Sequence, residues 1–312
     1  MIVYISPKSK EQLIQQGQFL VSARGESYPV INSIPRFVAV ENYAAAFGLQ
    51  WKKFSRTQLD SHSKIPVSAK RLEAALGDSP DILRDKNVLE AGCGAGRFTE
   101  ILLKIGAQVH SFDLSLAVEA SKENIGEHTG YQLCQAAIDG IPYPDEAFDL
   151  VVCLGVLQHT PSPEKSIAQL WKKVKPGGML VIDHYRLKLS YFFKLKPLWR
   201  FFIKHMEPGK AMELVRRLHE FYFPLHWKWR KQKMLRKILY RFSPLTDHLD
   251  DFPALDPETQ SEWSLLDSYD SLTDYYKHLR TPKQIRNILE SLRAKNISVT
   301  PGGTGIVARA EK

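Results

Sequence analysis

The chain has 312 residues, which allows one large domain or one domain with additions. Hydrophobic residues make up 44% and charged residues 25% of it, an ordinary balance for a globular protein. No apolar run approaches the roughly 18–20 residues of a membrane span, and residues 1–30 lack a secretory leader pattern. Composition therefore predicts a cytoplasmic protein and disfavours membrane-spanning and secreted classes.

The cysteines are too few and too widely spaced for a disulfide framework or a structural zinc site. They are Cys93, Cys134 and Cys153, and each falls in or beside an expected strand. We expect them to be small buried hydrophobic residues, and we expect no bound metal.

The net charge of +9 is distributed unevenly. Residues 186–242 hold sixteen Lys or Arg and three Glu, a local charge of +13, so the rest of the chain is slightly acidic. A basic block this concentrated indicates either a solvated helical face or a specific anionic partner.

In chain order, residues 1–40 have the pattern of a small β-rich unit. Its expected strands are 18–23 and 28–31, with a turn at 24–26. Residues 41–77 are expected to be helical, mainly over 43–51 and 68–76, until the Gly77-Asp78-Ser79-Pro80 cluster.

Residues 87–183 alternate between short apolar strands and amphipathic helices. The expected strands are 87–91, 107–112, 131–135, 149–154 and 179–183. The expected helices are 98–105, 116–125 with Ser115 as its cap, and 164–174, and a turn is expected at 175–178. This alternation predicts right-handed crossovers and a parallel sheet.

Residues 186–280 break the alternation: they are basic, aromatic and helical at first, then acidic and turn-rich from 247 to 274. A helix is expected from Thr281-Pro282 to about residue 293, followed by strands at 297–299 and 306–310. The expected organisation has four parts: 1–40, a helical lead-in and α/β core at 41–185, a helical insertion or lid at 186–280, and 281–312 completing the core.

The strongest chemical signal is Val88-Leu89-Glu90-Ala91-Gly92-Cys93-Gly94-Ala95-Gly96-Arg97-Phe98, at a strand-to-helix junction. Ligands of α/β sheets bind at such junctions, and glycines let the backbone turn tightly and approach a ligand closely. Asp113 ends the next strand, 23 positions after Glu90, where its carboxylate can accept hydrogen bonds from ribose hydroxyls.

A dinucleotide-binding oxidoreductase uses the same logic with the spacing G-x-G-x-x-G. Here Gly92, Gly94 and Gly96 alternate, and Arg97 and Phe98 follow in place of a third correctly spaced glycine. A carboxylate at Glu90 would repel pyrophosphate but could hold the zwitterionic amino-acid end of S-adenosylmethionine (SAM). The spacing therefore favours SAM over a nicotinamide cofactor.

With these residues in place, 87–183 resembles the SAM-binding core of class I methyltransferases, in the subgroup of ubiquinone/menaquinone-type enzymes. The matching stretches are 88–98, 109–115, 141–150, 155–161 and 170–182, about a third of the chain. Lys175-Pro176-Gly177-Gly178 resembles that subgroup's "LKPGG" turn, and Ile141-Pro142-Tyr143 its "LPF" segment. The resemblance implies a doubly wound, seven-stranded, mostly parallel α/β sheet with the last strand reversed.

The resemblance also implies roles for individual residues in SAM binding. Those implied at the methionine part are Glu90, Gly92, Cys93 and Gly94, with Gly96 completing the loop. Asp113 and Leu114 would hold the ribose and flank the adenine, Ala137 and Ile138 would line the adenine edge, and Leu154 and Gly155 would lie beneath the sulfonium. The family often has Asp where Ala137 stands, which leaves backbone contacts and Asp139 as substitutes.

The segment Tyr28-Pro29-Val30-Ile31-Asn32-Ser33-Ile34-Pro35 is similar to a stretch of small zinc-ribbon-like domains that precede some methyltransferases. This chain lacks the cysteines that bind metal in those domains. We interpret residues 1–40 as a metal-free support module.

Catalysis in this class depends mostly on bringing an acceptor into line with the methyl group, and a hydroxyl acceptor also needs a base. His159, which follows the fourth strand, is the candidate base. His184 and Tyr185 are weaker candidates, and for all three a structural role at a strand end is the competing interpretation.

The basic aromatic block at 186–242 has three interpretations: a helical lid with a solvated basic face, a surface for anionic lipid or a phosphate-bearing acceptor, and a single-stranded nucleic-acid surface. The sequence as a whole predicts a SAM-dependent methyltransferase acting on a small-molecule, lipid-linked or sugar-linked acceptor, at oxygen. The alternatives are a non-catalytic SAM-fold protein that docks on an anionic membrane or a partner through 186–242, and an RNA methyltransferase. Peripheral membrane contact is therefore expected more than nucleic-acid binding.

Overall fold

The structure is a computed structural model that describes residues 2–39, 45–188, 191 and 194–312. It contains two compact units. The first comprises residues 1–42, 68–186 and 276–312, and the second comprises 43–67 and 187–275. The four-part division expected from the sequence places its boundaries elsewhere and stays a prediction about the chain's organisation.

The first unit begins with a small antiparallel sheet in the order β1-β2-β3-β4. Its strands are β1 Ile14–Gln16, β2 Phe19–Val21, β3 Ser27–Ile31 and β4 Ile34–Pro35. The two strands expected from the sequence are β2 and β3. The other two are three and two residues long, too short to show a period of their own.

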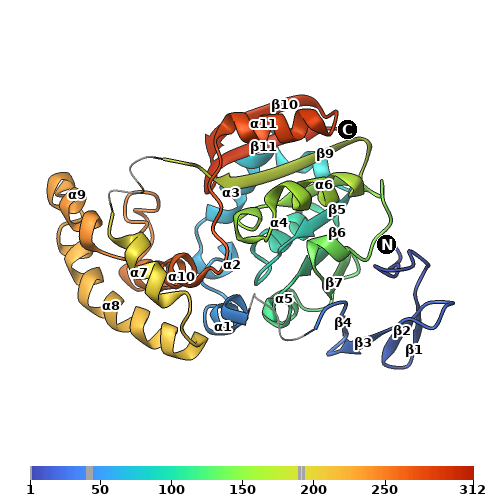
Figure 1. Cartoon of the computed structure of the whole chain (residues 1–312), viewed down its shortest axis with the longest axis horizontal. Helices are drawn as coiled ribbons and strands as arrows, with labels where there is room; N and C mark the ends of the chain where they lie inside the picture. Colours follow the sequence, from blue (N-terminus) through green and yellow to red (C-terminus); the bar gives the residue numbers. More distant parts are fainter. Residues whose placement is uncertain (1, 40–44, 189–190, 192–193) are drawn as a thin grey trace. The chain divides into compact units, whose positions relative to one another are not determined.

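The main sheet of the first unit has seven strands in the order β10-β11-β9-β8-β5-β6-β7 (Figure 1). They are β5 Asn87–Ala91, β6 Gln108–Asp113, β7 Tyr131–Gln135, β8 Phe148–Cys153, β9 Val174–Tyr185, β10 Lys295–Gly302 and β11 Gly305–Glu311. Strands β5 to β9 pair in parallel, whereas β11 runs antiparallel to β9 and to β10. The expected doubly wound sheet with a reversed last strand is confirmed.

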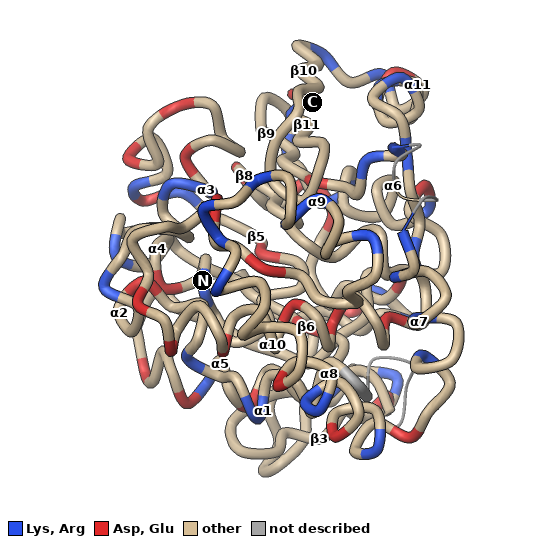
Figure 2. The backbone as a smooth tube through the Cα atoms, turned by 90° about the vertical axis from the view of Figure 1, so that its left-hand side faces the viewer, with Lys and Arg blue, Asp and Glu red and all other residues tan. Residues whose placement is uncertain are grey.

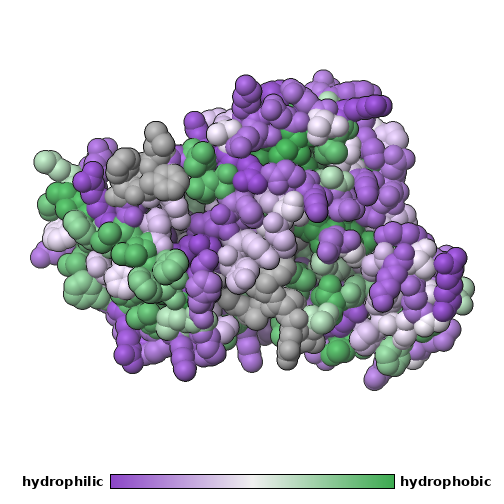
Figure 3. All heavy atoms as spheres, in the orientation of Figure 1, coloured by the Kyte–Doolittle hydropathy of each residue, from purple (hydrophilic) through white to green (hydrophobic). Residues whose placement is uncertain are grey.

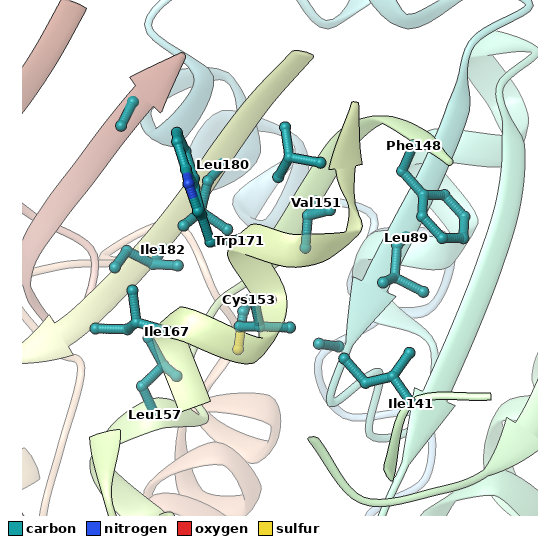
Figure 4. Close-up of a cluster of buried hydrophobic side chains, with 14 of the residues drawn as sticks. Leu89, Ile141, Phe148, Val151, Cys153, Leu157, Ile167, Trp171, Leu180 and Ile182 are labelled. Atoms are coloured by element: carbon teal, nitrogen blue, oxygen red, sulfur yellow. The ribbon is translucent and has the colours of Figure 1, made fainter. Parts of the chain in front are cut away.

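Helices cover both faces of this sheet because successive strand side chains point to opposite sides. The helices of the first unit are α3 Val67–Leu76, α4 Arg97–Ile105, α5 Ala117–Ile125, α6 Pro163–Lys173 and α11 Pro282–Ser291. Val88 and Val181 pack with α3 and α4, whereas Leu89, Val151 and their neighbours pack with α6 and α11 (Figure 4). The three cysteines are free and buried, as expected.

Two expectations for this unit are wrong in detail. The turn expected at 175–178 lies inside β9, because Gly177 and Gly178 pair with the backbone of Lys312 at the end of β11. The cap of α5 is Leu116, although the Ser115 hydroxyl does accept a hydrogen bond from the amide of Ala117 at 3.1 Å.

The second unit is helical. Its helices are α1 Ala45–Lys53, α2 Asp60–Ser63, α7 Lys196–Ile203, α8 Pro208–Lys228, α9 Lys233–Phe242 and α10 Pro257–Thr273. The core includes Phe54, Val215, Leu266 and Tyr269. The expected helix at 43–51 is confirmed from residue 45, and residues 43 and 44 lie outside the described part.

Helix α10 corrects the expectation of a turn-rich segment from 247 to 274. It begins at Asp256, whose carboxylate accepts hydrogen bonds from the amides of Glu258 and Thr259, and Pro257 occupies its first turn. The acidic residues of this segment suggested turns, but one face of the helix is buried and includes Trp263 and Tyr269. Within the described residues, no helix is long and apolar enough to cross a membrane.

Candidate functional site

The loop between β5 and α4 is built on glycine backbone conformations. Gly92, Gly94 and Gly96 have φ of +79°, +54° and +92°, in the left-handed region that side chains disfavour. A Cβ on Gly92 would also lie 2.3 Å from Cγ2 of Val156, which follows β8. Both the backbone conformation and the lack of room for a side chain therefore require glycine at this position.

Asp113, at the end of β6, fastens this loop to the next one. Its Oδ2 accepts a hydrogen bond from the amide of Gly94 at 3.0 Å, and its Oδ1 accepts from the amide and hydroxyl of Ser115 at 2.8 and 2.7 Å. Burial raises the pKa of Asp113 above its ordinary value, and these hydrogen bonds oppose the rise. The Asp113 carboxylate therefore lies where the β5–α4 loop and the turn after β6 meet.

Glu90 lies behind the loop and is 2% exposed. Its Oε2 accepts hydrogen bonds from the hydroxyls of Thr99 at 2.5 Å and Ser111 at 2.9 Å. Its Oε1 is buried and makes no hydrogen bond to any residue that the structure describes. Burial raises the pKa of Glu90 to about 7 despite the two hydroxyls, so this carboxyl lacks a cationic partner.

The Cys93 side chain turns away from the loop and packs with Ile34, Val118 and Leu133. Its backbone amide donates to the carbonyl of Phe112 at 3.1 Å. Any contribution of Cys93 to a ligand therefore comes from its backbone, and burial raises the pKa of its thiol well above the usual value.

Leu114, which the sequence predicts beside an adenine, is linked through Gln135 to Arg36 of the small N-terminal sheet. The Gln135 amide donates to the carbonyl of Leu114 at 2.9 Å, and the Gln135 carbonyl oxygen in turn accepts from the guanidinium of Arg36 at 3.3 Å. Ala137 precedes the 3-10 helix Ile138–Gly140, which begins beyond β7. Sequence reasoning missed Arg36 and Gln135, because 99 residues separate them.

Leu154 and Gly155 follow β8 and are held by Asp183 near the end of β9. The Asp183 carboxylate is 1% exposed and accepts from the amide of Gly155 at 2.6 Å. It also pairs with the guanidinium of Arg71 at 2.7 Å and accepts from the amide of Thr304 at 3.3 Å. Asp183 was expected only as a strand end, and the structure makes it the anchor of the Gly155 loop.

His159 lies in the 3-10 helix Leu157–His159 and is 7% exposed. Its Nδ1 is 3.3 Å from the carbonyl oxygen of Tyr276, which can only accept, so Nδ1 carries the proton. In the neutral ring, Nε2 then holds the lone pair that a general base needs. The ring of Tyr185 packs edge-on against the His159 ring, with the two ring centroids 5.4 Å apart.

His184 is the less suitable candidate. It is 1% exposed, its Nδ1 lies 3.0 Å from the carbonyl oxygen of Tyr185, and burial lowers its pKa. It remains neutral in the interior of the first unit.

The cofactor-site residues predicted from the sequence therefore gather at the carboxyl ends of four adjacent parallel strands, in the order β8-β5-β6-β7. This is the edge where doubly wound sheets bind ligands. No metal-binding group of three or more His, Cys, Asp or Glu occurs among the described residues.

Part of the chain is similar to known methyltransferases. Residues 89–182 match the family described as "Methyltransferase domain". A ubiquinone biosynthesis O-methyltransferase from Thiobacillus denitrificans is 36% identical over 100 residues, 31% of this chain and 43% of that protein. The mitochondrial protein of that name from Schizosaccharomyces pombe is 28% identical over 182 residues, 56% of this chain and 62% of that protein.

A solved SAM-dependent methyltransferase from Methanococcus maripaludis overlays with a TM-score of 0.47 at 14% identity, covering 88% of this chain and 96% of that chain. The chain spans about half the length of the curated relatives it matches. The matched segment, which contains the glycine loop and five of the seven sheet strands, is thus similar to methyltransferase domains.

Replacing Glu90 with Gln should flatten part of the dependence of stability on pH. The folded protein holds a proton on Glu90 up to about pH 7, whereas the unfolded chain releases it near 4.5. The free energy of unfolding therefore falls as the pH rises between these values, by an amount on the order of 3 kcal/mol. Urea denaturation of both proteins from pH 4.5 to 8 measures the difference, and parallel profiles would contradict the assignment.

Replacing Asp183 with Asn should weaken SAM binding about tenfold, because the Gly155 amide loses a charged acceptor. Asp149→Asn is the matched control. Asp149 lies at the amino end of β8, where it accepts from the amide of Asn87 at 3.0 Å and pairs with Lys175. Both variants should lose stability, but only Asp183→Asn should lose affinity in calorimetric titration. Equal affinities would make Asp183 a purely structural residue.

Proposed function

We propose that this chain is a SAM-dependent methyltransferase that acts on a hydroxyl group of a small-molecule acceptor. The observation that carries the proposal is the pair of carboxyls at the glycine loop. Glu90 has a buried, unpartnered Oε1, and the Asp113 carboxylate lies beside the loop. The first suits an ammonium group and the second a ribose hydroxyl, whereas a carboxylate at Glu90 would repel pyrophosphate.

The residues present fit SAM on this ground. Glu90 and the backbone of Gly92 to Gly94 would hold the amino-acid part, and Asp113 the ribose. Leu114, Ala137 and Ile138 would line the adenine, with Leu154 and Gly155 beneath the sulfur. Ala137 offers no side-chain acceptor for the adenine amino group, so this edge depends on backbone contacts.

Bound SAM supplies an electrophilic methyl group on a sulfonium leaving group. The chain's part is then to orient the acceptor oxygen and to remove its proton. His159 is suited to the second task, since the Tyr276 carbonyl fixes its tautomer with the lone pair on Nε2. The proton passes from the acceptor hydroxyl to this nitrogen as the oxygen–methyl bond forms.

Two features support an acceptor related to those of the matched relatives. Their printed name concerns ubiquinone, whose biosynthesis they serve by O-methylation. The basic residues of 186–242 favour an anionic or lipid-linked acceptor, or one presented at a membrane surface. Residues 1–40 would act as a metal-free support of the adenine side, through the contact of Arg36 with Gln135 of β7.

The cofactor proposal predicts micromolar SAM binding by calorimetry and no heat with NADH. Asp113→Ala should weaken SAM binding by about tenfold or more, because it removes the hydroxyl acceptor and the anchor of Gly94. Asp81→Ala, at an exposed carboxylate on the 3-10 helix Pro80–Leu83, is the control and should bind normally. NADH binding in place of SAM would overturn the proposal in favour of a nucleotide-cofactor oxidoreductase.

Replacing His159 with Ala should lower turnover by about a hundredfold and leave SAM affinity unchanged. Transfer of labelled methyl groups to hydroxylated quinone precursors, phosphorylated sugars and lipid hydroxyls measures this effect. His128→Ala, at an exposed histidine of the same unit, is the control. Full activity of His159→Ala would give the residue a structural role.

A further inference from the structure

Helix α9 presents three of its large apolar residues to solvent, and it buries an arginine together with Leu239. Met234, Ile238 and Phe242 follow one another at a spacing of four and are 75%, 53% and 53% exposed. On the opposite face, Arg236 is 4% exposed. A helix of a soluble domain normally has the reverse arrangement, with its apolar stripe inward.

Ion pairs of Arg236 fix this orientation. Its guanidinium lies 3.0 Å from Oδ1 of the buried Asp247 and 2.6 Å from Oδ1 of Asp250, and it donates to the hydroxyl of Tyr240 at 2.6 Å. Turning the helix over would leave Asp247 buried without this partner, which is costly. The exposed apolar stripe is thus a consequence of the packing of the second unit.

The neighbouring helix α7 extends the apolar surface. The amide of Leu195, at the start of α7, donates to the carbonyl of Arg241 in α9 at 2.9 Å, so the two ends adjoin. Leu198, Phe201 and Phe202 of α7 are each more than half exposed. Figure 3 shows apolar residues, in green, gathered on the surface formed by α7, α8 and α9.

A row of cations runs beside the apolar stripe. Lys233, Lys237 and Arg241 each precede one of the three apolar residues by one position, are exposed, and make no ion pair within the described part of the chain. The basic positions of α9 are blue in Figure 2. The block 186–242 carries a charge of +13, so a second copy of this surface would be repelled.

We propose that α9 and the adjoining face of α7 form a docking surface for an anionic lipid bilayer. An interfacial helix with large side chains inserted between the headgroups, and with lysines and arginines at its flank, matches such a surface in shape and charge. The apolar stripe enters the boundary of the acyl chains, and the cation row meets the lipid phosphates. This docking is independent of methyl transfer and needs neither SAM nor an acceptor.

The test is sedimentation of the full chain with vesicles, without SAM. The protein should bind vesicles of equimolar phosphatidylcholine and phosphatidylglycerol, bind phosphatidylcholine alone much more weakly, and dissociate as salt rises. The triple variant Lys233→Gln, Lys237→Gln, Arg241→Gln should bind about a hundredfold more weakly, from roughly fivefold for each cation. Ile238→Glu and, separately, Met234→Glu should each lower binding about tenfold by placing a carboxylate in the inserted face.

Matched controls make the same kinds of substitution elsewhere in the chain, which tests whether the position of the changed residues matters. Lys104→Gln, Lys165→Gln, Lys172→Gln removes three exposed lysines of α4 and α6, and Ile14→Glu places a carboxylate at an isoleucine that is 63% exposed in β1. Both controls should bind as the parent does. No vesicle binding by the parent, equal losses in the controls, or α9-dependent capture of single-stranded RNA in preference to vesicles would overturn the proposal. Failure of SAM binding would leave this result unaffected.

Discussion

The carboxylate of Asp183 is the interaction on which the carboxyl edge of the main sheet depends. A buried charge is tolerated only where cations and amides surround it. Arg71 from α3, the amide of Gly155 beyond β8 and the amide of Thr304 between β10 and β11 supply that surrounding. Three segments far apart in the chain must therefore meet at β9, and their meeting fixes the loop that would lie beneath the sulfonium.

Three acidic residues near this edge of the sheet differ in their hydrogen-bond and ion-pair partners. Asp183 pairs with a guanidinium and two backbone amides of the protein. Asp113 is held by the amides of Gly94 and Ser115. Glu90 has hydroxyl partners but no cation. Burial therefore raises its pKa without a cation to compensate. The proposed SAM would bring to Glu90 the ammonium group for which the protein has no counterpart.

The sequence predicted the elements whose signals are local. The limits of β5 and β7 follow from short apolar runs between turn residues, and the glycine loop follows from its spacing. The features that the sequence did not predict depend on contacts between residues far apart in the chain. The "LKPGG" segment joined β9 because Lys312 pairs with its glycines, and the roles of Arg71, Gln135 and Arg36 depend on partners from 21 to 112 residues away. No local pattern distinguishes such an arginine from a solvated one.

Helix α9 shows the same limit in its sharpest form, because an amphipathic sequence defines two faces without saying which one is buried. Apolar burial alone would turn Met234, Ile238 and Phe242 inward. The two aspartates that pair with Arg236 lie in a stretch after α9 that carries no strong structural signal of its own. Once they hold the arginine, the apolar stripe must face outward, together with the cations beside it. A basic block that could have been a solvated lid therefore becomes a surface whose two halves, apolar and cationic, match the two layers of an anionic membrane interface.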